Sequence, residues 1–175
     1  MAEIEQTLII LKPDTIQRGL VGEILSRFER AGLKIVAMKM VKPSEQRFHD
    51  HYEGIGKLIS RWGEDIYSVT MSHMTTTPVI VFVLEGVEVV SYVRKLVGTT
   101  DPQDSPAGTI RGDYTHVTRA YTNPVGRTLP NILHASGDAE EAVQEIALWF
   151  DKDEIHSEYE NVHAKVVHGR IPEKK

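Results

Sequence analysis

One short segment of the chain combines residue types that can do covalent chemistry. Pro130–Asp138 reads PNILHASGD, in which His134 is followed closely by Ser136. A neutral imidazole is available near pH 7 as a nucleophile or a general base, provided that a partner fixes its tautomer. Glu145 is a candidate partner, because it adjoins the apolar Ile146 at the margin of a helical apolar face and can reach the preceding loop. The other interpretation of His134 is a hydrogen-bonded histidine near the surface, one of eight in the chain.

Basic and hydroxyl side chains near the ends of predicted elements form a second group. Lys12 follows an apolar run, Arg94 lies in a helical pattern, and Thr100 follows a glycine. Arg111 lies in TIRGD. Each of them alone is typical of a surface or turn residue. Together they can complement a triphosphate, because arginine and lysine suit phosphate oxygens. Since the net charge is -5, phosphate binding would need such a local cluster.

The sequence lacks the common signatures of several other classes of site. It contains neither the GxxxxGK[ST] phosphate loop nor GxGxxG after a strand, and neither CxxC nor HExxH. A tightly held zinc ion is therefore not expected, and the acidic chain is not expected to bind nucleic acid. There is no cysteine, the longest apolar run (Pro78–Leu84) is too short for a bilayer, and the N-terminus lacks the basic region of a signal peptide. These features predict a cytoplasmic protein without membrane association.

Hydropathy patterns predict alternating strands and helices. Apolar runs predict the strands Thr7–Pro13, Leu33–Val41 and Pro78–Gly86, with a short last strand near Asn131–Leu133. Helical spacing of apolar residues predicts the helices Leu20–Phe28, Val87–Val97 and Ala139–Phe150. Ser44 can cap a further helix that runs to about His51, and Glu53–Met74 is expected to be a mixed helical segment. Gly98–Arg127 has no sustained periodicity and is expected to be mostly loop, which at this length is usually functional or disordered.

The order of these elements fits an α+β fold, a ferredoxin-like βαββαβ sandwich in which helices cover one antiparallel sheet. At 175 residues the chain is long enough for one well-buried domain. We expect this domain to occupy residues 1–150. The charged residues 151–175 are expected to form a C-terminal extension that packs on the domain or trails from it.

Three segments closely resemble the nucleoside diphosphate kinase family, in that family's order. They are Thr7–Met40, Val83–Tyr114 and Asn131–Phe150, together about half the chain. Their motifs KPD, VRKLVGTT, AGTIRGD and NILHAS make a highly specific combination. The resemblance implies ping-pong phosphoryl transfer, in which a nucleoside triphosphate gives its γ-phosphate to a histidine and a nucleoside diphosphate then accepts it.

The resemblance also implies roles for single residues. His134 matches the family's nucleophile, Glu145 matches the glutamate that holds the other ring nitrogen, and Ser136 matches the serine that steadies this glutamate. Lys12 and Asn131 match residues that contact the ribose hydroxyl, with Lys12 also near the transferring phosphate. The remaining matches surround the phosphates: Tyr52 close to the transferring phosphate, and Arg94, Thr100 and Arg111 on the β- and γ-phosphates.

A metal ion and an assembly are further implications of the resemblance. Family members use Mg²⁺, which the nucleotide and water largely hold, so no carboxylate cage is expected in the sequence. Few contacts specific to the base are expected, and the substrates are therefore expected to include purine and pyrimidine nucleotides. Family members usually form hexamers or tetramers from a common dimer, so the chain is expected to be a homo-oligomer.

The chain departs from the family's pattern after Tyr52 and beside His134. The family usually has a phenylalanine shortly after this tyrosine that stacks on the base, whereas this chain reads GIGKLISRWGEDIYSVT. Trp62, Tyr67 or neither takes that place. The family's H-G-S-D becomes HASGD, in which alanine is still small enough for a tight approach.

A loop insertion is the third departure. Arg111 and His134 lie about ten positions further apart than is usual, which indicates an insertion around Thr115–Pro130. Its Arg119 and Arg127 are either phosphate contacts or surface arginines. The changed base segment and this insertion leave one alternative to the enzyme, a non-catalytic nucleotide-binding or regulatory protein that kept the fold.

Overall fold

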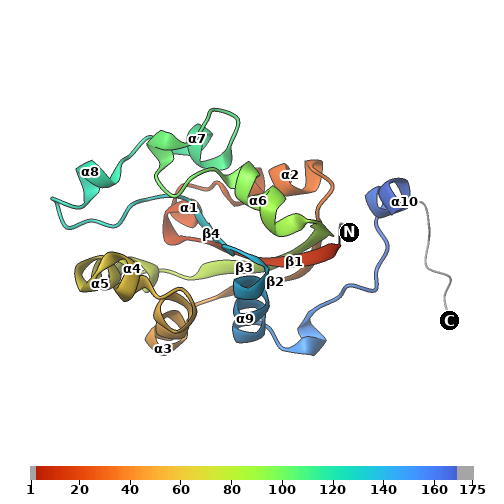
Figure 1. Cartoon of the computed structure of the whole chain (residues 1–175), viewed down its shortest axis with the longest axis horizontal. Coiled ribbons are helices and arrows are strands. Elements are labelled where there is room, and N and C mark those ends of the chain that lie inside the picture. Colours follow the sequence, from red (N-terminus) through yellow and green to blue (C-terminus); the bar gives the residue numbers. More distant parts are fainter. Residues whose placement is uncertain (1–2, 169–175) are drawn as a thin grey trace.

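A four-stranded antiparallel sheet runs through the middle of the molecule in the order β2-β3-β1-β4 (Figure 1). The computed structural model describes residues 3–168. Its strands are β1 (Ile4–Leu11), β2 (Lys34–Val41), β3 (Val79–Val87) and β4 (Leu133–Ala135). This strand order, with helical connections between successive strands, confirms the predicted ferredoxin-like sandwich.

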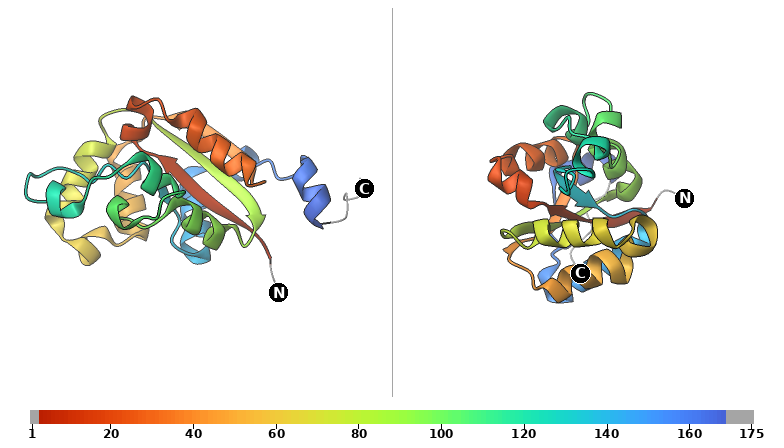
Figure 2. Two further views of the ribbon diagram at one scale, coloured as in Figure 1. Left: turned by 90° about the horizontal axis from the view of Figure 1, so that it is seen from above. Right: turned by 90° about the vertical axis from the view of Figure 1, so that its left-hand side faces the viewer.

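Helices cover both faces of the sheet (Figure 2). On one face lie α1 (Pro13–Gln17), α2 (Val21–Arg30), α6 (Val89–Val97) and α7 (Ile110–Tyr114). On the other face lie α3 (Glu45–His49), the π-helical turn Asp50–Ile55, α4 (Leu58–Trp62), α5 (Glu64–Met74) and α9 (Ala139–Trp149). The helices α8 (Arg119–Thr122) and α10 (Val162–His168) and the 3₁₀ turns Pro102–Asp104 and Lys152–Glu154 complete the described elements.

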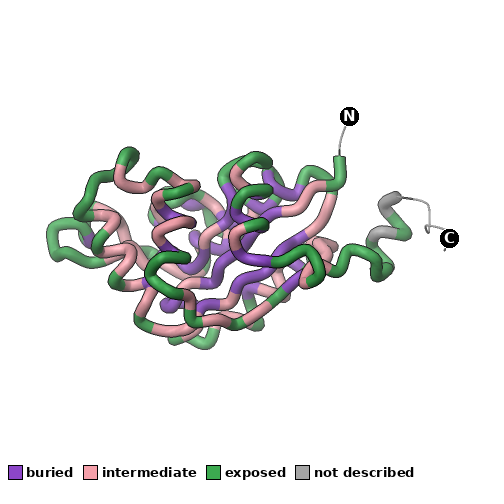
Figure 3. The backbone as a smooth tube through the Cα atoms, turned by 90° about the horizontal axis from the view of Figure 1, so that it is seen from below, coloured by how far each residue is buried: buried purple, intermediate pink, exposed green. Residues whose placement is uncertain are grey.

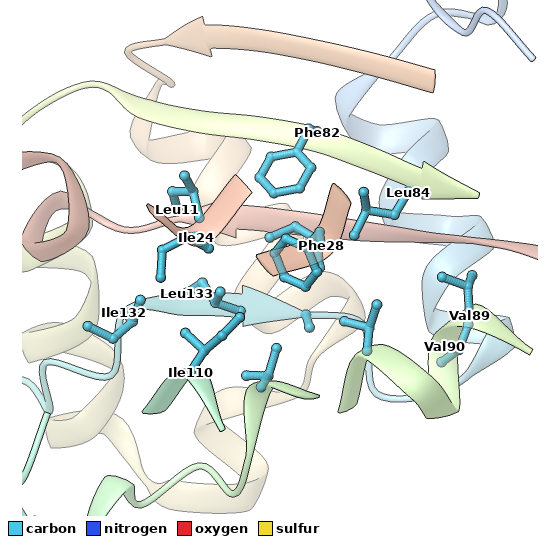
Figure 4. Packing of buried hydrophobic residues seen from close by; sticks show 14 of the residues in the cluster. Leu11, Ile24, Phe28, Phe82, Leu84, Val89, Val90, Ile110, Ile132 and Leu133 are labelled. Atoms are coloured by element: carbon cyan, nitrogen blue, oxygen red, sulfur yellow. The ribbon is translucent and has the colours of Figure 1, made fainter. Parts of the chain in front are cut away.

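The central strands β1 and β3 are mostly apolar where both of their faces are buried. Successive side chains of a strand point to opposite faces, so Ile9 and Leu11 pack with α2 and α6 while Leu8 and Ile10 pack on the other side. Figure 4 shows the first of these cores, in which Phe28 of α2 meets Phe82 of β3 with ring centroids 5.9 Å apart. The second core contains Phe48, Met74 and Trp149 from α3, α5 and α9. Figure 3 shows the resulting band of buried residues along the sheet.

Gly98–Arg127 is mostly loop, as predicted, but the short helices α7 and α8 lie within it. Both are single turns without apolar periodicity, held instead by local caps. The Thr109 hydroxyl accepts from the backbone N–H of Gly112 at 3.1 Å, and the Thr118 hydroxyl accepts from that of Tyr121 at 3.1 Å. The last strand also lies slightly later than the predicted Asn131–Leu133.

The chain after α9 returns along the edge strand β2. The backbone N–H of His156 donates to the carbonyl of Val36 at 2.7 Å, and the Tyr159 hydroxyl donates to that of Ile35 at 2.6 Å. The helix α10 then projects from the body of the molecule (Figure 1). Residues 169–175 of the predicted extension lie outside the described residues. No helix within residues 3–168 combines the length and apolarity needed to cross a membrane.

Candidate active site

A cavity of about 390 Å³ lies where β1 ends beside the start of β4, and the predicted site residues meet there. The elements around it come from far apart in the sequence: the end of β1, the π-helical turn, α4, α5, α6, the inserted segment, β4 and α9. Of the predicted residues, those that line it are Lys12, Tyr52, Arg94, Thr100, Arg111, Asn131, His134 and Glu145. Ser136 lies behind Glu145, to which it is hydrogen-bonded.

His134 is placed by β4 and oriented by Glu145. Its backbone pairs with Ile10 of β1, and its Nε2 lies 2.8 Å from Oε1 of Glu145. A carboxylate at this distance holds the proton on Nε2 and leaves Nδ1 with its lone pair. Within residues 3–168, Nδ1 of His134 has no hydrogen-bond partner, and the side chain remains 21% exposed. The hydrogen bond therefore fixes Nε2 and leaves Nδ1 able to act as a nucleophile.

Glu145 is a buried carboxylate whose two oxygens both have hydrogen-bond partners. The Ser136 hydroxyl donates to its Oε2 at 2.6 Å, while the same hydroxyl accepts from the backbone N–H of Leu8 at 3.1 Å. Burial opposes the ionisation of Glu145, but its electrostatic interaction and hydrogen bond with His134 and the hydrogen bond from Ser136 outweigh it, so that the pKa falls to about 2. The carboxylate is therefore charged at every pH at which the protein would work.

A second histidine, which the sequence did not single out, packs against this pair. The ring of His51 lies 4.5 Å from that of His134 between centroids, nearly perpendicular to it. The indole N–H of Trp149 donates to Nδ1 of His51 at 3.3 Å. Burial, together with electrostatic interaction with His134, lowers the pKa of His51 to about 3, so this imidazole stays neutral. The sequence signal that could have identified His51 as a site residue is its position directly before Tyr52.

The ligand atoms of His51, His134 and Glu145 lie within 4.8 Å of one another, which raises the question of a metal site. Mg²⁺ prefers an octahedron of oxygen ligands, whereas this group offers two imidazoles and one carboxylate. Moreover, the carboxylate and His134 are already hydrogen-bonded to each other. The group does not fit Mg²⁺, and the described chain offers no other cluster of this kind.

Lys12, Asn131 and Thr100 form a chain of hydrogen bonds beside His134. Lys12 donates through Nζ to Oδ1 of Asn131 at 2.6 Å, and the amide of Asn131 donates to the carbonyl of Thr100 at 3.0 Å. Burial lowers the pKa of Lys12 to about 8, against the opposing charge of Asp14 and with the help of Arg111 and Arg119. Lys12 is therefore a cation near neutrality that loses its charge in mild alkali.

The backbone between Asn131 and His134 is strained, and Asp14 of the KPD motif holds it. Ile132 has φ +72°, a left-handed conformation that costs a β-branched residue about 1–3 kcal/mol. The Asp14 carboxylate accepts from the backbone N–H of Ile132 at 3.0 Å. The carbonyl of Ile132 accepts from the N–H of Lys12 at 3.0 Å and from the Thr15 hydroxyl. This turn brings the Asn131 amide and the His134 ring into one cavity. The sequence motif contained Asp14 but did not reveal this role.

Arg111 is far more enclosed than a predicted phosphate ligand would suggest. It is 4% exposed and donates to the carbonyl oxygens of Asn131, Gly98, Thr99 and Leu133 at 3.1, 3.1, 2.9 and 2.8 Å. A guanidinium has five N–H donors, so most of them join the loop after α6 to the segment that carries His134. The group therefore brings positive charge to the cavity while its hydrogen bonds shape the cavity wall.

Tyr52 and Arg94 complete the predicted set. The Tyr52 hydroxyl is buried and has no hydrogen-bond partner within residues 3–168, and burial raises its pKa. Such a group is an unused donor in a cavity wall. Arg94 lines the same cavity from α6.

The structure separates the two aromatic residues that were candidates for the base. Trp62 lines the cavity and is 50% exposed. Tyr67 is not in the cavity wall, and its hydroxyl bonds to Nδ1 of His49 at 2.7 Å. The inserted segment also reaches the cavity, through Arg119 and Arg127.

Phosphoryl transfer is the chemistry that this arrangement supports, because it requires mainly a positioned nucleophile and fixed positive charge. His134, held by Glu145, can supply the nucleophile, and the cations around the cavity supply the positive charge. Together with the ferredoxin-like fold, the site defines a phosphotransferase.

Comparisons with known proteins give the family. The profile of the nucleoside diphosphate kinase family matches residues 5–155. The nucleoside diphosphate kinase of Pyrococcus furiosus is 43% identical over 156 residues, 89% of each chain. That of Borreliella burgdorferi is 41% identical over 152 residues, 87% of this chain and 90% of the relative. The chain belongs to the nucleoside diphosphate kinase family, whose members are enzymes.

Solved structures of nucleoside diphosphate kinases have the same fold as this chain. The Borrelia burgdorferi nucleoside diphosphate kinase, solved as a transition-state mimic with bound vanadate and ADP, superposes with TM-score 0.89 at 39% identity. The match covers 93% of this chain and 96% of that chain. The Halobacterium salinarum enzyme in complex with CDP superposes with TM-score 0.76 at 35% identity, covering 94% and 97%.

Proposed function

We propose that the protein transfers the γ-phosphate of a nucleoside triphosphate to a nucleoside diphosphate through a phosphohistidine at His134. Nδ1 attacks the γ-phosphorus, the bond between this phosphorus and the β,γ-bridging oxygen breaks, and the nucleoside diphosphate leaves with the electron pair. An acceptor diphosphate then attacks the same phosphorus and releases His134. The carrying observation is the 2.8 Å contact of His134 Nε2 with Glu145, which leaves Nδ1 without a protein partner among residues 3–168.

Glu145 and Ser136 act as positioning residues in this proposal. When Nδ1 becomes bonded to phosphorus, the ring gains positive charge and its Nε2 proton stays in place. The fixed carboxylate of Glu145 stabilises that charge, and Ser136 holds the carboxylate at 2.6 Å. Both therefore favour the phosphorylated ring over the free one.

The remaining predicted residues bind the nucleotide. We assign Arg94, Thr100 and Arg111 to the β- and γ-phosphates, and Lys12 with Asn131 to the ribose hydroxyl. Lys12 also neutralises charge at the transferring phosphate, where the unpaired Tyr52 hydroxyl can donate. The position of these groups around one cavity supports the assignment.

Trp62 stacks on the base in this proposal, because it presents an exposed ring to the cavity whereas Tyr67 does not. A ring face accepts any base, so purine and pyrimidine nucleotides are both substrates. Relatives bound to ADP and to CDP support this breadth.

Mg²⁺ enters as part of the substrate, the metal complex of the nucleotide. The phosphate-binding groups of the cavity are cations and neutral donors, which suits an ion held by phosphate oxygens and water. When bound, the ion supplies positive charge on the phosphates.

Assembly and location complete the proposal. We infer a homo-oligomer of the family's hexameric or tetrameric type and a cytoplasmic location. We further infer that residues 1–150 are the catalytic unit and 151–175 its extension.

Raising the pH should weaken the free protein's reaction with nucleotide through Lys12. Because its pKa is about 8, Lys12 is a cation below that pH and neutral above it. We expect kcat/KM for ATP to fall by up to about tenfold between pH 8 and 9.5. Lys12→Arg keeps its charge in this range, so its profile should stay flat there even at a lower absolute rate. A wild-type profile that is flat to pH 9.5, or an identical decline in the variant, contradicts this role of Lys12.

Initial rates with ATP and GDP varied together test the two-step reaction. A phosphohistidine intermediate predicts parallel double-reciprocal lines, because the first product leaves before the acceptor binds. Lines that intersect would indicate direct transfer in a ternary complex, and an absence of turnover would indicate the non-catalytic nucleotide-binding protein.

A further inference from the structure

The inserted segment brings an arginine into the cavity that the roles above leave unused. Arg119 is the first residue of α8, and its guanidinium carbon lies 4.2 Å from the ring centroid of Trp62. Both residues line the same cavity as His134. The insertion therefore forms part of the site wall.

The backbone of Arg119 is tied to the phosphate side of the cavity. Its N–H donates to Oδ2 of Asp101 at 3.1 Å, and Asp101 directly follows Thr100. The Thr118 hydroxyl caps the same turn through the N–H of Tyr121. Two contacts thus fix the base of this side chain, although its guanidinium forms no ion pair with any carboxylate of the described residues.

The charge of Arg119 acts on the groups assigned to the nucleotide. After burial, which is the main cause, Arg119 is among the charges that lower the pKa of Lys12 to about 8 and of Arg111 to about 10. Like charges that repel one another around a cavity make a polyanion a favourable occupant. All three cations line the same cavity.

We propose that Arg119 is an additional phosphate-binding residue of the nucleotide site, supplied by the inserted segment and resting on Trp62 until a nucleotide binds. This inference rests on the proposed function, in which the base stacks on Trp62. A base on the ring face that Arg119 covers would take the place of the guanidinium. The displaced group exchanges a cation–π contact for charge-assisted hydrogen bonds to phosphate, which are the stronger interaction.

Binding of ADP and of adenosine separates this role from its alternatives. Arg119→Gln should weaken ADP about tenfold, the effect of losing one charged phosphate contact. It should leave the inhibition constant of adenosine unchanged or improved, because adenosine has no phosphate and Trp62 is uncovered. Arg119→Lys, which restores a cation, should recover part of the loss. Lys95→Gln removes an exposed charge of α6 that does not line the cavity, and we expect it to weaken ADP less than threefold.

Three results would overturn the proposal. Arg119→Gln could change ADP binding less than twofold, it could match Lys95→Gln, or it could weaken adenosine as much as ADP. The second would show a general effect of charge, and the third a role only in placing Trp62. If Arg119→Gln does not fold, Arg119→Lys against wild type decides between the same outcomes at smaller amplitude. Labelling of His134 by γ-labelled ATP in the wild type is scored separately, so a failure of the proposed function is distinguishable from a failure of this inference.

Discussion

His134→Gln is expected to lower turnover by about 10⁴-fold or more, because it removes the atom that forms the bond to phosphorus. Glutamine is the most specific replacement, because it removes Nδ1 while its amide N–H can reach the position of Nε2 and keep the hydrogen bond to Glu145. The fold should therefore persist, with the free energy of unfolding lowered by less than about 1 kcal/mol. Steady-state phosphate transfer from ATP to GDP measures the effect.

Binding and a matched histidine make this result specific. ADP affinity should change less than about threefold in His134→Gln, because the groups assigned to the phosphates remain. His156→Gln is the control, since His156 lies in the segment after α9 with a side chain 63% exposed, and its activity should stay within about twofold of wild type. Substantial activity in His134→Gln would place the nucleophile elsewhere.

Arg111→Met is expected to damage both stability and activity. The substitution deprives four carbonyl oxygens of a charge-assisted donor, those of Gly98, Thr99, Asn131 and Leu133. Losing one partner of such a buried charged network costs about 3–5 kcal/mol. Turnover should fall about 10²-fold or more even where the protein is folded, because the cavity also loses a fixed cation.

Urea unfolding and turnover at low temperature measure the two effects of Arg111→Met separately. Arg18→Met is the matched control, since Arg18 donates to the carbonyl of Tyr114 at an exposed position and its loss should cost less than about 1 kcal/mol. Arg111→Lys should recover part of the activity and little of the stability, because an ammonium has three donors and cannot reach all four carbonyls. Arg111→Met as stable as wild type would contradict the structural role of this arginine.

The sheet and its long helices follow from hydropathy because burial on two faces leaves a strong pattern. Strands such as β3 are apolar on both sides, and α9 presents a continuous apolar face with an Asp138 cap. The turns α7 and α8 leave no such pattern, because hydroxyl caps rather than apolar burial hold them. The sequence therefore predicted that Gly98–Arg127 is mostly loop but not the two helical turns within it.

The candidate site was predictable where a motif names the residue and unpredictable where only space brings residues together. His134, Ser136 and Glu145 lie close in sequence, and the structure places them in one hydrogen-bonded set. His51 and Trp149 join that set across the second core, a contact that sequence distance conceals. Likewise, residue types predicted that Arg111 belongs to a set of phosphate-binding groups but could not show that most of its donors bind backbone carbonyls.

A single-turnover labelling experiment tests the central claim most directly. The full-length protein is incubated with γ-labelled ATP without an acceptor, digested under alkaline conditions that preserve phosphohistidine, and mapped by mass spectrometry. We predict one acid-labile phosphate per chain, on the peptide that contains His134, and its complete transfer to GDP on a chase. Label on a different residue, or label on His134 that GDP does not remove, would contradict the account.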